Sequence, residues 1–101
     1  MVCRSSGELT ETSGASGNGQ IAIASSGRKL ISIHGYADSG TVAECIVYDN
    51  TAGSGTIVAR MRVEDGSFEY DMHGVLCQKG LFAVVTTPTG SGNHGFTVEF
   101  S

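Results

Sequence analysis

The side chains best suited to chemistry in this sequence are its histidines and cysteines, and they are widely spaced. His34, His73 and His94 occur singly, without the HxH or HExxH spacing that brings two imidazoles onto one metal ion. None has a cysteine at zinc-site spacing. The sequence therefore predicts no metal site and no cofactor, with one alternative: a histidine on the symmetry axis of an oligomer needs only one copy per chain to bind a metal.

The cysteines favour a reduced protein. The number of cysteines is odd, and no two of them form a CxxC motif; they are Cys3, Cys45 and Cys77. We therefore expect neither a closed disulfide framework nor a redox motif. Cys45 lies in the apolar-rich segment 42–48 and is predicted to be a small buried hydrophobic residue.

Acidic residues and one glycine-rich loop are the remaining candidates for catalysis or ligand binding. The aspartates considered are Asp38, Asp49, Asp65 and Asp71. Three of them stand beside Gly, Ser or Asn, where a turn explains an aspartate, and calcium binding is the weaker alternative. Residues 89–94 (TGSGNH) lack the helix and lysine of a phosphate-binding loop, so we expect a hairpin loop there. The sequence predicts a protein that is not an enzyme.

Length and charge restrict the possible partners. The chain has 101 residues, enough for one domain, and its formal net charge is -4 with only six scattered Lys and Arg. Phosphate backbones are therefore poor partners. No apolar run approaches the roughly twenty residues of a membrane span, and the N-terminus lacks the apolar core of a signal peptide. We expect a protein made in a cytoplasm, with neither nucleic-acid nor membrane partners.

Short segments rich in β-branched, aromatic and aliphatic residues recur along the chain, separated by clusters of Gly, Asn, Asp and Ser. Seven strands are expected, at residues 20–24, 29–37, 41–49, 56–63, 67–73, 81–87 and 95–100. No window has a convincing apolar stripe at helical spacing. The sequence predicts an all-β fold, a small antiparallel β-sandwich of the jelly-roll or Ig-like kind with seven to eight strands.

Asp65 and Gly66 give the sharpest local prediction, because they are favoured central residues of a two-residue type I′ hairpin turn. Such a turn pairs residues 56–63 with residues 67–73. The expected cross-strand pairs are Val63 with Phe68, Met61 with Tyr70, Ala59 with Met72, Arg62 with Glu69 and Arg60 with Asp71. The expected core contains Met61, Val63, Phe68, Tyr70, Leu81, Val85, Phe96 and Val98.

Residues 1–19 are dominated by Ser, Thr and Gly and contain too little apolar surface to offset the entropy of ordering. We expect a flexible arm there, followed by a single sandwich domain at residues 20–101. The arm is either disordered or becomes ordered by adding a strand to a neighbouring subunit.

Two central strands are apolar on both faces, although alternation leaves one face of a solvated strand polar. We predict that the outward-facing apolar residues form an interface. These residues are Ile46, Tyr48, Val58, Phe82 and Val84. A small monomer seldom exposes so many large apolar side chains together. Either other parts of the same chain cover them, or they form an interface with further copies of the chain or another protein.

The same strands contain a sequence motif. Tyr48, Asp49 and Asn50 end one strand, and Gly53 and Gly55 lie in the next turn. A later strand of the form G-L/I-x-V-x-V comprises Gly80, Leu81, Phe82, Ala83, Val84 and Val85. Over residues 41–100 the chain resembles small β-sandwich structural proteins of tailed bacteriophages.

The resemblance implies a component of the virus particle, commonly a trimer, and no catalytic residues. The most direct expectation is a capsid decoration (cement) protein that binds the major capsid protein lattice. The alternative is a tail- or fibre-associated module that binds a receptor or glycan; the absence of Trp and the assignment of Tyr70 to the core count against it. A sandwich-type hydrolase would need a cluster of Asp, Glu or His that the spacing does not provide.

Overall fold

The computed structural model of the chain describes residues 3–101, which form six β-strands and no helix. The strands are β1 (Arg4–Leu9), β2 (Gln20–Ala24), β3 (Arg28–Asp49), β4 (Thr56–Cys77), β5 (Leu81–Thr89) and β6 (His94–Phe100). All strand pairs are antiparallel, so the all-β expectation is confirmed. Within the described residues there is accordingly no helix of the length and apolarity needed to cross a membrane.

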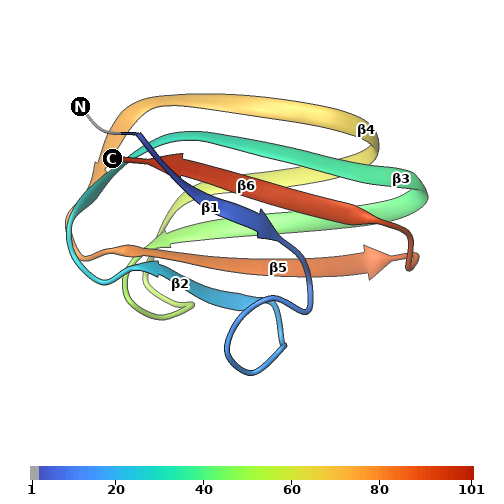
Figure 1. Cartoon of the computed structure of the whole chain (residues 1–101), viewed down its shortest axis with the longest axis horizontal. Helices are drawn as coiled ribbons and strands as arrows, with labels where there is room; N and C mark the ends of the chain where they lie inside the picture. Colours follow the sequence, from blue (N-terminus) through green and yellow to red (C-terminus); the bar gives the residue numbers. More distant parts are fainter. Residues whose placement is uncertain (1–2) are drawn as a thin grey trace.

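Two strands of 22 residues, β3 and β4, form a long ribbon that bends in the middle. The first half of β3 lies between β6 and the second half of β4, and β1 extends this layer beyond β6. The second half of β3 lies between β5 and the first half of β4, and β2 extends that layer beyond β5. We call these the β6 layer and the β5 layer. Figure 1 shows the ribbon turning back on itself at one end of the molecule, which curls the single hydrogen-bonded sheet into a half-barrel.

The two bends merge the seven expected strands into five, and the unexpected strand β1 brings the number to the six that are observed. Six of the expected strands lie in β3, β4, β5 and β6, and the other is β2. Both long strands bend at the breaks that the sequence analysis placed, at residues 38–40 and 64–66. Positive φ values at Gly40 (84°), Asp65 (52°) and Gly66 (146°) allow these corners. The Asp-Gly pair therefore redirects one strand between layers.

The predicted hairpin register is wrong for this reason. Arg62 pairs with Glu44 of β3, and Glu69 pairs with His34, so neither residue opposes the other. The remaining expected pairs are also absent, because both halves of β4 pair with β3 instead. A turn signal specifies positive φ at two residues but leaves open which strand supplies the hydrogen-bonding partners.

The predicted core is correct except on the second half of β4. The residues at 0–1% exposure include Met61, Val63, Leu81, Val85, Phe96 and Val98. Phe68 and Tyr70 are instead 52% and 44% exposed. They share the inward-facing side with Gly35 and Ile33, their partners on β3, on the half of β4 that is the free edge of the β6 layer. Met61 and Val63 also lie on an edge half-strand but are buried, so Phe68 and Tyr70 are exposed because the opposite layer does not cover their half of β4.

Close contact between the layers requires glycine at position 35. A Cβ atom there would lie 2.8 Å from Sδ of Met61 in the opposite layer and 2.7 Å from the ring of Phe96. The core formed in this way includes Cys45, where burial raises the pKa of the thiol to about 12, as expected for an inert, buried cysteine.

The structure differs from the expected N-terminal arm over residues 4–9, which form β1 against the edge of β6. Leu9 is only 4% exposed and belongs to the core. The loop that follows is tied down: Nε2 of His94 accepts a hydrogen bond from the Glu11 amide (3.1 Å), and the Gly19 carbonyl accepts one from the Val85 amide (2.8 Å). The apolar content of residues 4–9 is small, but backbone pairing with β6 and the burial of Leu9 make this segment a strand of the same domain. Residues 1–2 lie outside the described residues.

Replacing Leu9 with alanine tests whether β1 is integral. We expect a loss of about 2 kcal/mol or more, since a buried leucine is truncated. For a domain of this size that lowers the melting temperature by roughly 10 °C. Arg4→Ala, on an exposed position of the same strand, serves as the control. Equal melting temperatures for wild type and Leu9→Ala would show that residues 4–9 behave as a free arm in solution.

Candidate functional site

The outer side of the β5 layer carries a continuous group of large apolar side chains. Ile46 of β3 pairs directly with Val84 of β5, and Tyr48 pairs with Phe82. Directly opposed residues in an antiparallel pair project from the same side of the sheet. Four of the five predicted interface residues therefore lie together, and all four are partly exposed.

The fifth residue, Val58, is placed differently. It packs against the core, whereas its neighbour Ile57 pairs with Tyr48 and is 42% exposed. The cause is a register shift between Val47 and Tyr48, where β4 has one extra residue. Simple alternation along β4 predicts that Val58 faces outward and Ile57 inward, the reverse of what the structure shows. No local sequence signal marks the register shift. We call Ile46, Tyr48, Ile57, Phe82 and Val84 the apolar face.

The loop between β3 and β4 covers part of the apolar face. A Cβ atom at Gly53 would lie 3.1 Å from Cγ2 of Val84 and 3.3 Å from Cε1 of Phe82, so the loop backbone rests on these two side chains. Part of the covering thus comes from the same chain, which was one of the two alternatives. The remaining exposed area, together with exposed Ile57, is available to a partner.

Asp49 and Asn50 hold the loops around the apolar face. The Asp49 carboxylate accepts hydrogen bonds from the backbone amides of Lys79 (2.8 Å) and Gln78 (3.0 Å). The Lys79 bond is the main reason that the pKa of Asp49 lies below its usual value, with further lowering from Gln78. Nδ2 of Asn50 donates to the Ser54 carbonyl (2.8 Å) across the β3–β4 loop. The YDN motif therefore has a structural role beside the candidate interface.

Charged residues border the apolar face. Arg60 is exposed and pairs with Ile46, and Arg62 lies 3.3 Å from the carboxylate of Glu44. An apolar centre with a polar rim is the usual anatomy of a protein-protein interface. Both arginines are thus surface residues of the sheet, paired with β3.

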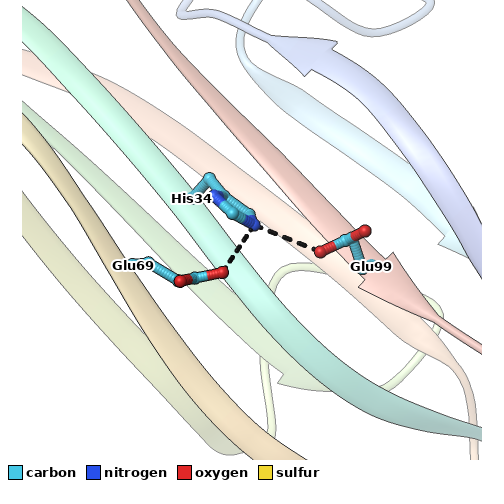
Figure 2. Close-up of side chains that lie close together, drawn as sticks. All are labelled: His34, Glu69 and Glu99. Atoms are coloured by element: carbon cyan, nitrogen blue, oxygen red, sulfur yellow. Dashed lines mark hydrogen bonds and ion pairs between the residues drawn. The ribbon is translucent and has the colours of Figure 1, made fainter.

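A second cluster lies on the outer side of the β6 layer, and the sequence analysis missed it. Figure 2 shows Nε2 of His34 between two carboxylates, 2.9 Å from Oε2 of Glu69 and 3.1 Å from Oε1 of Glu99. Among residues 3–101 it is the one group of His, Cys, Asp and Glu side chains with the spacing of metal ligands. The predicted register places Glu69 opposite Arg62, so the sequence gives no link between Glu69 and His34. Only the pairing of three distant segments brings the cluster together.

The carboxylate of Glu99 is the most strongly held of this group. The Ser32 hydroxyl donates to Oε1 of Glu99 (2.5 Å), and this bond, followed by that of the His34 ring, lowers the pKa of Glu99 below its usual value. Beside the cluster is a shallow groove of about 340 Å³, whose lining includes Glu8 and Tyr36. Desolvation and then the negative charges of Glu8 and Asp38 raise the pKa of Tyr36, so the groove has an acidic character.

Comparisons with known protein families, curated proteins and solved structures found no match for this chain. The two surfaces described above therefore have to be interpreted from their own geometry.

The hydrogen bonds to Asp49 predict a pH dependence of stability. They favour the ionised carboxylate in the folded state, so their contribution is complete above the ordinary aspartate pKa of about 3.9 and is lost as the pH falls through the lower folded pKa. We expect Asp49→Asn to lower the free energy of unfolding at pH 7. The difference from wild type is expected to shrink as the pH falls from about 5 toward 2.

Urea unfolding at several pH values measures this effect. Asp65→Asn, at the exposed corner of β4, is the matched control, because within the described residues no backbone amide donates a hydrogen bond to its carboxylate. A wild-type minus Asp49→Asn difference that stays constant with pH would contradict the role of the charged carboxylate.

Proposed function

We propose that this chain is a non-enzymatic structural protein whose copies meet through the apolar face and then join a larger assembly. The observation that carries the proposal is the direct pairing of Ile46 with Val84 and of Tyr48 with Phe82 on a partly exposed outer surface. Exposed Ile57 enlarges this surface, and arginines border it. Burying large apolar side chains contributes roughly 25 cal/mol per Å² to the free energy of association. The loss of translational and rotational entropy offsets part of this gain.

The assembly that we propose is a virus particle, with the chain as a capsid decoration protein on the lattice of the major capsid protein. The support is the resemblance over residues 41–100 together with a small, acidic, all-β domain. The YDN motif on which the resemblance rests also secures the loops beside the apolar face. Incubating the purified chain with undecorated capsids and measuring co-sedimentation tests this partner.

We further propose that the free protein is a closed homo-oligomer, preferably a trimer. A closed ring buries the apolar face without polymerising, which an accessory protein must avoid before it reaches its particle. A domain of 101 residues has a limited core of its own and gains stability from such assembly.

Phe82→Asp tests the role of the apolar face. We expect the wild-type chain to sediment as an oligomer at micromolar concentration and the variant to sediment as a folded monomer. A charge at this partly exposed position must be desolvated when the interface forms, whereas in the monomer it remains near water. Analytical ultracentrifugation gives the size, and circular dichroism checks that the variant is folded.

Thr89→Asp is the matched control, since it adds the same charge to an exposed position at the far end of the same strand, outside the apolar face and its charged border. It is expected to assemble as wild type does. A monomeric wild-type chain at high concentration, or a Phe82→Asp variant that still assembles, would contradict the proposed interface.

One observation supports the alternative function, recognition of a glycan or receptor. Phe68 and Tyr70 are exposed on the edge of the β6 layer, and Phe68 also lines the acidic groove. Aromatic faces beside carboxylates suit sugar rings and their hydroxyl groups. Glycan-array binding that is lost in Tyr70→Ala but kept in Phe82→Asp would favour this function over assembly through the apolar face.

A further inference from the structure

Three side chains from three neighbouring strands direct their polar atoms to one point on the outer side of the β6 layer. His34 comes from β3, Glu69 from β4 and Glu99 from β6 (Figure 2). One nitrogen and two carboxylate oxygens lie within 4.8 Å of one another. Nε2 of His34 lies between the two carboxylates, at 2.9 and 3.1 Å.

The backbone pairing fixes this convergence. His34 and Glu69 are direct partners across β3 and β4, while Glu99 pairs with Ser32, two residues before His34 on β3. Direct partners have Cβ atoms about 5 Å apart, and diagonal neighbours remain within reach of long side chains. The three ligands therefore stand on a rigid hydrogen-bonded sheet, which holds a site more precisely than loops do.

A single proton does not satisfy the group. Nε2 of His34 carries at most one hydrogen, whereas two carboxylates approach it from different strands. Without that hydrogen, three acceptors face one another. A cation shared by all three atoms satisfies the imidazole and both carboxylates at once.

The distances suit a small metal ion. In a tetrahedral zinc site with bonds of about 2.0–2.1 Å, neighbouring ligand atoms lie about 3.3 Å apart. The His34 to Glu69 and His34 to Glu99 separations of 2.9 and 3.1 Å need to open by only a few tenths of an ångström. The carboxylate oxygens of Glu69 and Glu99 lie within 4.8 Å of each other, and their side chains, 58% and 37% exposed, are free to adjust around an ion.

We propose that His34, Glu69 and Glu99 form a binding site for one divalent transition-metal ion, with Zn²⁺ as the best fit. An imidazole nitrogen with two carboxylates suits zinc, whereas Ca²⁺ and Mg²⁺ prefer sites made of oxygen atoms. Three protein ligands leave the fourth position to water on the solvent side.

The hydroxyl of Ser32 orients one ligand of this site. It donates to Oε1 of Glu99, and Ser32 is itself only 5% exposed. Such hydrogen bonds to ligating carboxylates fix their direction and raise affinity. Bound metal links the second half of β4, which has a neighbour on one side only, to β3 and β6. The ion thus stabilises the free edge of the sheet.

Titration of the metal-free full chain with zinc chloride tests the site, by calorimetry and by native mass spectrometry. We expect one zinc ion per chain and a higher melting temperature with zinc but not with magnesium or calcium. His34→Ala and Glu69→Gln are expected to lose this binding, and Ser32→Ala to weaken it about tenfold. Circular dichroism checks that each variant is folded.

Two controls separate this site from other zinc ligands. His73→Ala removes another exposed histidine, whose Nδ1 lies 3.5 Å from one carboxylate of Asp71, and is expected to bind zinc as wild type does. Cys3→Ser removes the exposed thiol and is also expected to keep the site. Absence of zinc binding by wild type, or unchanged binding by His34→Ala, would overturn the proposal. Zinc binding by Phe82→Asp shows that the site is independent of the apolar face.

Discussion

The pairing of β3 with β4 along their whole length is the constraint on which the rest of the structure depends. Both strands bend, so one ribbon supplies two adjacent strands to each layer, with β3 inside the layer and β4 at its edge. The β6 strand then pairs with the first half of β3 and β5 with the second half, and β1 and β2 complete the two layers. The corner residues with positive φ fold the layers onto each other, so that Gly35 of one layer lies against Met61 of the other.

The ribbon also places the two halves of β4 in very different environments. The first half lies where alternating residues enter the core, as Met61 and Val63 do. Both halves have β3 as their one neighbour, but the opposite layer does not cover the second half, where Phe68 and Tyr70 remain in contact with solvent. Edge strands invite pairing with other chains, and natural proteins often protect them with charges and irregular backbone. Here the edge carries Glu69, and His73 has a positive φ of 54° that interrupts a flat strand.

The two outer surfaces consequently have different chemistry. The β5 layer presents the apolar face, bordered by arginines and partly covered by the β3–β4 loop. The β6 layer presents His34 between two carboxylates beside an acidic groove. An apolar surface gains free energy by excluding water, whereas converging ligand atoms gain it by sharing a cation. The proposed assembly and the proposed metal site are therefore independent uses of opposite sides of one small domain.

The sequence by itself determined the all-β class, most strand positions and most of the core, because alternation and turn residues are local properties of the chain. It also predicted that Ile46, Tyr48, Phe82 and Val84 face outward together, since both sides of their strands are apolar. Tertiary structure decided which strands pair. The Asp65-Gly66 signal specified backbone geometry and left the partner strand open, and the extra residue in β4 exchanged Val58 for Ile57. The cluster of His34, Glu69 and Glu99 depends on three non-local pairings, which no spacing within the sequence encodes.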